Sequence, residues 1–293
     1  MTDLRLPLPY GENTLDITVA SDDVDVIRPR FVPGLEDEEA AFIKALEQPL
    51  GCPALGAMIQ PADTLAIVIP DITRALPSER LLTWLLACLG HPDPQRIVII
   101  IGTGTHRPNT PAEIVRMVGG EIAAKYRVIN HNSFDNDTML QVGTREGGHP
   151  ILMNREYVLA DKRLIMGFIE PHFMAGFSGG YKAIFPGITD FESIMYYHRA
   201  AVIGDPRSTW GNLDRNPTQE QIRRNGAQAG VDFCINVTLN SKGAITAFFC
   251  GDVVSAHNAG CAFAKDTAMV KCERAYPIVI TSNSGFPLDQ NLY

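Results

Sequence analysis

The sequence predicts an α/β fold in which helices flank a mostly parallel central sheet that also contains an antiparallel hairpin. Short apolar runs alternate with segments of helical periodicity along most of the 293 residues, which is the pattern of parallel strands joined by helices. The run Ile97–Ile101 has no polar member, as expected of a strand buried on both faces. Residues 240–244 form a short, glycine-containing link between two apolar runs, which predicts a hairpin there.

The expected strands are short apolar runs bounded by polar or glycine-rich segments. Near the N-terminus, strands are expected within Leu4–Ala20, on either side of Tyr10–Asn13. The further expected strands are Thr64–Ile69, Arg96–Ile101, Tyr126–Asn130, Arg163–Ile169, Phe233–Leu239, Ile245–Phe249 and Ile278–Ser282. The last of these follows the clearest candidate boundary, near Lys271–Tyr276, so it either joins the first sheet or begins a second domain.

Apolar residues at helical spacing predict the helices that would cover this sheet. These are Asp37–Leu46, Ser78–Leu89, Thr110–Val118, Ser193–Val202, Thr218–Asn225 and Val253–Met269. The third helix has the clearest start, with Thr110 as the N-cap, Pro111 at the first helical position and Glu113 to complete a capping box. The length of the chain fits one large domain or two smaller ones.

Composition excludes several classes of protein. With 45% hydrophobic and 20% charged residues, the chain is expected to fold as an ordinary globular protein. The net charge of −8 and the lack of a basic run argue against nucleic acid as a partner. No apolar segment is long enough to span a membrane, and no secretory signal opens the sequence. The six cysteines contain no C-x-x-C pair and are expected to be reduced core residues of a cytoplasmic protein.

Titratable residues follow several of the expected strands at the point where each strand ends. Asp71 and Arg74 follow one strand, and His106, His131 and His172 follow three others. In an open α/β sheet, ligands bind beyond the carboxyl ends of the strands, so these side chains are expected at one sheet edge. Each residue alone is more typical of a helix cap, an ion pair or a turn. Their shared position is what predicts an active site.

The other histidines give weaker signals. His131 fits a structural and a catalytic role equally well. His91 lies in a Gly-His-Pro loop, His149 follows two glycines, and His257 falls within an expected helix, so these three are expected to be structural. By itself, His198 is most simply a core or surface residue of a helix.

The densest candidate segment is Gly167–Gly187, and within it Gly176–Lys182 has the sequence GFSGGYK. Its glycines can expose backbone N–H groups that surround a phosphate, although the spacing is not that of a P-loop. A flexible connection is the simpler interpretation of glycines alone, but the interleaved Phe177 and Tyr181 indicate an ordered loop. Burial of an amine in such a loop lowers its pKa, which would make Lys182 nucleophilic.

Five segments, in the same order, resemble the nickel-dependent lactate racemase (LarA-like) family. They are PDITR, GTGTHRP, EPHFMAGFSGGYKAIFPGI, YYHR and NSGFPLDQNLY, and together they extend over nearly the whole chain. The resemblance implies a racemase or epimerase of small 2-hydroxy acids that works by hydride transfer, with cofactor-synthesis proteins as partners. It also implies a nickel-pincer nucleotide, a pyridinium mononucleotide with sulfur arms that hold nickel, covalently linked at Lys182.

The resemblance also implies roles for individual residues. His106 and His172 match the paired acid/base histidines, and His198 matches the histidine that ligates nickel. Arg74 and Tyr293 match residues that bind the substrate. The residues that match the cofactor-binding set are Lys182, Asp71, Ser178, Gly179 and Gly180.

The chain departs from the family pattern in three places. Ala75 and Asn109 stand where the family commonly has proline and methionine. Family members continue beyond Tyr293 into a second α/β domain that closes over the site and supplies a glutamine and a lysine to the substrate. On this basis, residues 1–274 are expected to form the N-terminal cofactor-binding and catalytic domain. Residues 275–293 are expected to be the start of a truncated C-terminal domain, so that the site of this chain alone is incomplete.

Two other functions stay open from the residues alone. The chain could be a non-catalytic module that binds a nucleotide phosphate or an organic acid through the same loop. It could also be a metal-dependent hydrolase that uses His106, His172 and His198, although their spacing matches no H-E-x-x-H signature. Ligand binding without isomerisation would favour the first alternative, and tight zinc binding with esterase or amidase turnover would favour the second.

Overall fold

The computed structural model describes residues 3–20, 23–282 and 285–286, and its centre is a six-stranded sheet with the order β12-β11-β8-β3-β4-β5. The strands are β3 (Leu65–Pro70), β4 (Ile97–Gly102), β5 (Arg127–Asn130), β8 (Lys162–Phe168), β11 (Phe233–Leu239) and β12 (Ile245–Gly251). All neighbours are parallel except β11 and β12, which form the predicted hairpin. The predicted fold class is therefore confirmed.

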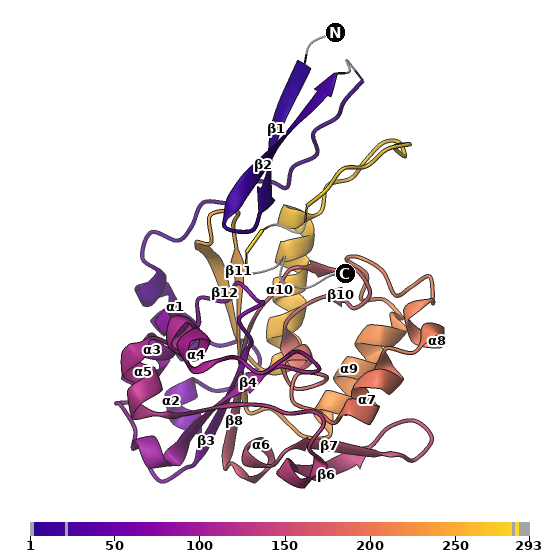
Figure 1. Ribbon diagram of the computed structural model, residues 1–293. Helices are drawn as coiled ribbons and strands as arrows, with labels where there is room; N and C mark the ends of the chain where they lie inside the picture. The colour runs from indigo at the N-terminus through magenta and orange to yellow at the C-terminus, as the bar shows by residue number, and fades with distance from the viewer. Residues whose placement is uncertain (1–2, 21–22, 283–284, 287–293) are drawn as a thin grey trace.

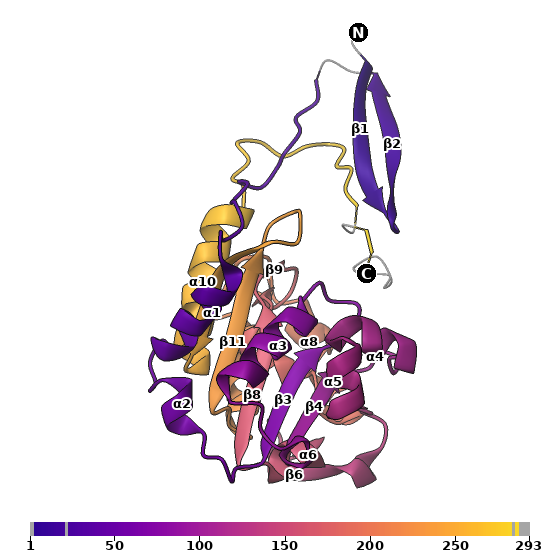
Figure 2. The same cartoon turned by 90° about the vertical axis from the view of Figure 1, so that its left-hand side faces the viewer.

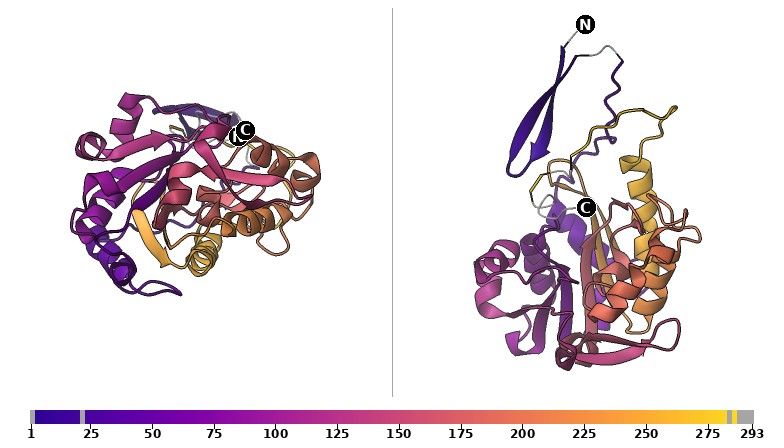
Figure 3. Two further views of the ribbon diagram at one scale, coloured as in Figure 1. Left: turned by 90° about the horizontal axis from the view of Figure 1, so that it is seen from below. Right: turned by 45° about the vertical axis from the view of Figure 1, so that its right-hand side comes forward.

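Helices cover both faces of this sheet, so the body of the molecule has three layers (Figures 1 and 3). One face carries α1 (Glu38–Glu47), α2 (Leu55–Met58), α3 (Ser78–Cys88), α4 (Pro111–Val118) and α5 (Gly120–Lys125). The other carries α6 (Arg155–Leu159), α7 (Phe191–Tyr197), α9 (Pro217–Ala227) and α10 (Val253–Ala268), with α8 (Ala200–Ile203) beside α9. Successive strand residues face opposite layers, so Ile67 and Val68 belong to two separate cores.

The predicted N-terminal strands are present, and they form a hairpin that stands apart from the three-layered body (Figures 1 and 2). Strand β1 (Asp3–Tyr10) pairs with β2 (Asn13–Ala20). The chain beyond α10 returns to this hairpin, where Phe286 N donates to Gly11 O at 2.8 Å.

The prediction of a strand at Ile278–Ser282 is wrong. This segment lies on the returning chain, where Ile278 is 79% and Val279 75% exposed, and it pairs with no described strand. Its β-branched residues favour extended backbone, but strand propensity becomes a strand only where a partner supplies hydrogen bonds and packing.

The structure adds elements that hydrophobic periodicity does not reveal. Strands β6 (Met139–Thr144) and β7 (Pro150–Asn154) form a hairpin, and β9 (Pro171–His172) pairs with β10 (Gly176–Phe177). The described residues also form the short 3₁₀ helices η1 (Pro94–Arg96), η2 (Asn136–Thr138) and η3 (Gly180–Ala183). These elements are too short or too polar to show a clear period in the sequence.

The predicted helices are present near their expected bounds, with one exception. The capping box is confirmed, since Thr110 Oγ1 accepts from Glu113 N and Glu113 Oε2 accepts from Thr110 N. The prediction of one helix at Ser193–Val202 is wrong, because the chain breaks between α7 and α8 at Arg199, whose backbone is extended (φ −64°, ψ 149°). His198 is therefore the C-cap of α7 and does not lie within a helix.

Two further expectations concern the class of protein. In the described part of the chain, no helix has the length and apolar character needed to cross a membrane. All six cysteines are free; Cys234, Cys250 and Cys261 are buried, whereas Cys88 and Cys272 are exposed. The expectation of core positions therefore holds for only part of the set.

Candidate active site

The predicted site residues come from loops and short elements at the carboxyl edge of the sheet. Asp71 follows β3, His106 lies in the loop after β4, and His172 lies on β9, just after β8. Lys182 lies on η3 and His198 ends α7. Strand order therefore places segments that are far apart in the sequence at the same edge, as parallel topology requires.

The charges at this edge act on one another, which shows that the side chains share one site. Lys182 is influenced by the positive charge of Arg74 and by the carboxylate of Asp71. His172 is influenced by Lys182, Arg74 and His198. These five side chains, together with His106 through its bond to Asp71, form a single cluster.

His106 is held by a carboxylate. Its Nδ1 lies 2.6 Å from Asp71 Oδ2, and because an ionised carboxylate can only accept, Nδ1 carries the hydrogen. The Nε2 atom then keeps its lone pair, and no described residue bonds to it. The pair therefore presents a base at Nε2 whose protonated form the Asp71 carboxylate would stabilise.

Asp71 is buried and remains ionised. Burial alone would raise the pKa of Asp71, but hydrogen bonds from His106 and Thr73 and the charge of His106 outweigh it and lower the pKa below its ordinary value. Thr73 donates twice to Asp71 Oδ1, from its backbone N at 2.9 Å and from Oγ1 at 2.5 Å. This is the local reason for the Asp-x-Thr spacing after β3.

A buried amide joins the loops that carry Asp71 and His106. Asn109 Oδ1 accepts from Ile72 N at 3.2 Å, and Asn109 N donates to Asn130 Oδ1 at 2.8 Å. Asn130 Nδ2 donates back to Asn109 O at 2.9 Å. Asn109 thus ties together the ends of β3, β4 and β5.

His172 is held in the opposite sense to His106. Its Nδ1 accepts from the backbone N of Met174 and of Ala175, each at 3.3 Å. The neutral imidazole therefore carries its hydrogen on Nε2. Burial, and then the positive charges of Lys182 and Arg74, lower the pKa of His172 to about 2. In this state His172 is a neutral hydrogen-bond donor at Nε2.

Lys182 is a half-buried amine with an altered pKa. Burial and the neighbouring Arg74 guanidinium lower the pKa of Lys182 to about 8, against the opposing influence of Glu170 and Asp71. A larger fraction of the amine is therefore uncharged near neutral pH than for an exposed lysine, which makes it a better nucleophile.

The turn that carries Lys182 packs directly on the end of β4. A β-carbon at Gly102 would lie 3.2 Å from Ala183 O, so the glycine allows the turn to approach the strand. Gly104 N donates to Gly187 O at 3.0 Å and fixes the two loops to each other. These contacts connect the His106 loop to the Lys182 turn.

His198 is oriented by the helix that it ends. Its Nδ1 lies 2.8 Å from Ile194 O, and because a carbonyl only accepts, Nδ1 donates and Nε2 keeps a free lone pair. Burial lowers the pKa of His198, which favours the neutral form that binds metals. A neutral imidazole with its second nitrogen bonded to a carbonyl is the usual arrangement of a metal-ligating histidine.

The glycine-rich loop is ordered by contacts within the protein. Ser178 Oγ donates to Phe168 O at 2.9 Å and accepts from Glu170 N at 2.9 Å. Gly180 N donates to Asn236 Oδ1 at 3.3 Å. Because the Ser178 hydroxyl holds the loop against the end of β8, the loop would offer an anion mainly its backbone.

His131, which the sequence left undecided, has both ring nitrogens bonded inside the protein. Its Nε2 lies 2.9 Å from Thr189 O, and its Nδ1 lies 3.4 Å from Asn154 Nδ2. The side chain is 2% exposed, and burial lowers the pKa of His131 to about 4. His131 therefore joins β5 to the segment that leads into α7, a structural role.

Glu170 belongs to the cluster although sequence reasoning missed it. Burial raises the pKa of Glu170, and Arg74 and Lys182 act on it in the opposite direction. Its position directly after β8, ahead of Pro171 and His172, was the available signal. Tyr293, the other predicted substrate residue, lies outside the described residues.

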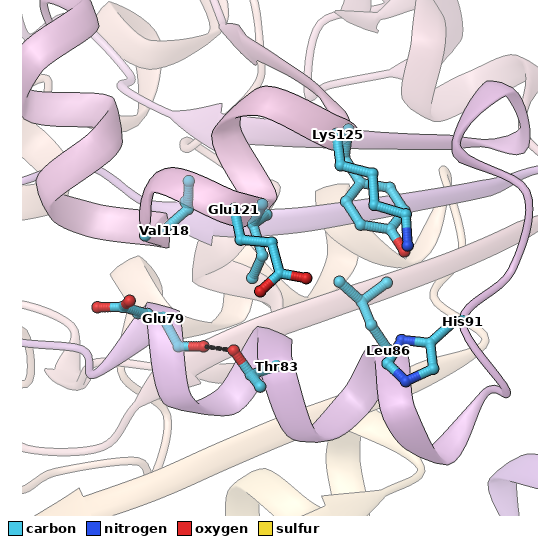
Figure 4. A pocket seen from close by; sticks show the side chains of 10 residues that line it. Glu79, Thr83, Leu86, His91, Val118, Glu121 and Lys125 are labelled. Carbon is cyan, nitrogen blue, oxygen red and sulfur yellow. Dashed lines mark hydrogen bonds between the residues drawn. The ribbon is translucent and has the colours of Figure 1, made fainter.

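Two cavities differ in their relation to this cluster. A cleft of about 410 Å³ lies beside His106, between the loops that follow β4 and β5. A smaller cavity of about 90 Å³ lies between α3 and the α4–α5 corner, where Glu79 and Thr83 face Glu121 and Lys125 (Figure 4). None of the predicted site residues lines the smaller cavity.

The fold and the cluster together are those of an α/β enzyme with a candidate active site at the carboxyl edge of a parallel sheet. Residues 10–211 match the family described as the lactate racemase N-terminal domain. The chain is 34% identical over 299 residues to a lactate racemase of Lactiplantibacillus plantarum, an alignment that covers 99% of this chain and 69% of that protein. The chain belongs to the lactate racemase family, as the five sequence segments predicted.

A second relative and a solved structure also support membership of the lactate racemase family. A lactate racemase of Thermoanaerobacterium thermosaccharolyticum is 33% identical over 293 residues, covering 99% of this chain and 68% of that protein. The solved structure of the lactate racemase apoprotein from the same organism superposes with a TM-score of 0.86 at 32% identity, covering 98% of this chain and 68% of that one. The chain is accordingly a lactate-racemase-like isomerase.

Proposed function

We propose that this protein racemises or epimerises a small 2-hydroxy acid by moving a hydride between the substrate carbon and a nickel-pincer nucleotide. One observation carries the proposal: three imidazoles with an open Nε2 gather with Lys182 and Arg74 in a single cluster. Membership of the lactate racemase family supports the substrate class.

The residues present fit the implied cofactor. His198 Nε2 would ligate the nickel, since its Nδ1 is committed to Ile194 O. In the described residues, no three His, Cys, Asp or Glu side chains are grouped to hold a metal ion, so further donors would come from the sulfur arms of the cofactor. The Lys182 amine, with its pKa lowered to about 8, suits a covalent amide-type link. The glycines of the loop let its backbone pack closely, because a β-carbon at Gly179 would lie 2.7 Å from Ile169 Cγ1 and one at Gly180 2.8 Å from His257 Cγ. The phosphate would be held by backbone N–H groups of this loop.

A hydride route suits this substrate class. Removing the C2 proton of a 2-hydroxy carboxylate is difficult, because the neighbouring carboxylate is already anionic. When bound, the nickel–pyridinium group would supply a centre that accepts a hydride from C2 and returns it to either face. The residues of the chain then have to bind the carboxylate and control the hydroxyl proton.

Two imidazoles would control the hydroxyl proton. His106 Nε2 takes the proton as the hydride leaves C2, and Asp71 stabilises the resulting imidazolium. His172 has Nε2–H as its second, unbonded nitrogen, since Nδ1 accepts from two backbone N–H groups. To act as a base for the opposite enantiomer, His172 has to carry its hydrogen on Nδ1 and give up its two backbone bonds of 3.3 Å.

Ligand binding would favour that change at His172. The charges of Lys182 and Arg74 are among the causes of its low pKa. An amide-type link removes the charge of Lys182, and a substrate carboxylate bound bidentately to Arg74 neutralises the guanidinium. Both changes raise the pKa of His172, which brings it closer to the range of an acid/base catalyst.

The test uses protein produced together with the cofactor-synthesis enzymes. We expect bound nickel by elemental analysis and an increased mass on the peptide that contains Lys182. We also expect loss of optical rotation when the protein is incubated with one member of a panel of single-enantiomer 2-hydroxy acids. Protein that holds a nucleotide or organic acid but changes no substrate would contradict the proposal and favour a binding module.

A further inference from the structure

His257, which the sequence did not connect with function, lies directly beneath the glycine-rich loop. It is on α10 and is 2% exposed. Its Nε2 lies 3.0 Å from Ser178 O, and its Nδ1 lies 3.0 Å from Arg223 Nη2 on α9. A histidine from one helix and an arginine from another therefore meet below the segment that precedes Lys182.

The partners of His257 fix its tautomer. A guanidinium can only donate, so His257 Nδ1 must accept from Arg223 and cannot carry the hydrogen. The hydrogen of the neutral ring is therefore on Nε2, where it is donated to Ser178 O. Burial, followed by the charge of Arg223, lowers the pKa of His257 to about 4, so the ring is neutral at physiological pH.

This bond orients one peptide group of the loop. In a trans peptide the C=O and the following N–H point in opposite directions. Because Ser178 O points to His257, Gly179 N–H points away from α10. Gly180 N donates elsewhere, to Asn236 Oδ1, whereas Gly179 N–H has no hydrogen-bond partner among the described residues.

Close packing keeps the loop in this position. Gly180 has φ +56°, and a β-carbon there would lie 2.8 Å from His257 Cγ. The backbone of the loop thus packs against the imidazole ring. The ring therefore fixes how closely the loop approaches α10, as well as the direction of the Ser178 carbonyl. Arg223 is in turn held by Asn258 Oδ1 at 2.6 Å.

We infer that His257 is a positioning residue of this site. Arg223 fixes the tautomer of His257, and His257 Nε2–H then holds the Ser178 carbonyl on the side of α10. The Gly179 N–H therefore points away from α10, where it would bind an anionic phosphate oxygen of the cofactor. The identity of that phosphate rests on the proposed function. The orientation of the peptide group rests only on the contacts of His257.

The experiment measures phosphate binding by the cofactor-free protein. Inorganic phosphate and nicotinic acid mononucleotide are titrated separately while the Gly179 amide is followed by ¹H–¹⁵N NMR. Long-range ¹H–¹⁵N spectra report the tautomer of His257. We expect the Nε2–H tautomer and a shift of the Gly179 amide with both probes, with tighter binding of the mononucleotide if a nucleotide phosphate is the natural occupant.

Three variants and a control separate positioning from folding. His257→Leu is expected to weaken phosphate binding about tenfold, the effect of one hydrogen bond to a charged group, whereas His257→Gln, which keeps a donor, retains most of it. Arg223→Met is expected to let His257 adopt either tautomer, and so to weaken phosphate binding less than His257→Leu does. His131→Leu, at an equally buried histidine away from the loop, should leave phosphate affinity unchanged.

Each outcome decides the inference. Unchanged affinity in His257→Leu, a Nδ1–H tautomer in the wild type, or equal losses in His257→Leu and His131→Leu would overturn it. Absence of any phosphate response at Gly179 in the wild type would also overturn it. The phosphate titration uses cofactor-free protein, whereas nickel content and the mass at Lys182 are measured on wild-type protein made with the cofactor-synthesis enzymes. A failure of the inference is therefore distinguishable from a failure of the proposed function.

Discussion

Two groups of histidines occupy different regions of the molecule and differ in how many ring nitrogens the protein uses. At the carboxyl edge, His106, His172 and His198 each have Nδ1 bonded and Nε2 open among the described residues. In the layer around them, His131 and His257 have both nitrogens bonded and are 2% exposed. One bonded nitrogen orients a ring for chemistry, whereas two bonded nitrogens make it a structural support.

The largest expected effect is on the edge group. His106→Gln and His172→Gln are each expected to reduce racemisation by about 100- to 10,000-fold, the usual contribution of general acid–base catalysis. The midpoint of urea unfolding should change little, because both rings are partly exposed. A single-turnover assay for the 2-oxo acid, run with each pure enantiomer, should show each variant failing with a different enantiomer. If the urea midpoint of either variant fell together with its activity, the histidines at the carboxyl edge would not differ from the structural histidines, and the prediction would be contradicted.

A smaller effect is expected from the residue that orients His106. Asp71→Asn removes the carboxylate that holds Nδ1–H, and we expect a decrease in turnover of about 10- to 100-fold, as for other groups that orient a functional histidine. Formation of the 2-oxo acid from the enantiomer that depends on His106 should slow more than its formation from the other enantiomer. Single-turnover assays with each pure enantiomer, with Asp161→Asn as an exposed control, measure the difference. Equal losses with both enantiomers would show that Asp71 serves the whole site.

For the histidines with both ring nitrogens bonded, we expect an effect on the free energy of unfolding and not on turnover. The folded-state pKa of His131 is about 4, against an ordinary value of 6.5, so the unfolded chain binds a proton first as the pH falls. The stabilising contribution of neutral His131 is therefore complete above about pH 6.5 and is lost progressively down to about pH 4. Urea unfolding of wild type and His131→Leu at several pH values should show a shallower pH dependence in the variant, by about 1–3 kcal/mol. Identical pH profiles would contradict the assignment.

The sequence predicted most of the sheet because its strands are continuous apolar runs, such as Ile97–Ile101, that only a doubly covered strand explains. The position of the candidate site was predictable because parallel strands end at a common edge. The roles of its individual residues came from the resemblance and stay predictions. The bonding state of each histidine was not predictable, since it depends on atoms from distant segments. His257 shows this most clearly: within α10 it has no signal of its own, and only Arg223 and Ser178 give it a role.

Two errors have the same physical origin. Ile278–Ser282 has strand composition without a neighbouring strand, and the break before α8 at Arg199 interrupts a segment with continuous helical spacing. Local propensity shows which secondary structures a segment can form, while contacts with the rest of the chain decide which one it does form.

The central claim is that the open imidazoles serve a hydride transfer, and substrate labelled with deuterium at C2 tests it most directly. The cofactor-loaded protein is incubated in ordinary water with one enantiomer of the labelled 2-hydroxy acid, and the product enantiomer is isolated and analysed by mass spectrometry. A hydride route predicts that the product keeps its deuterium, because the label never meets solvent. Replacement of the deuterium by solvent hydrogen during inversion would show that C2 loses a proton to a base, and would contradict the account.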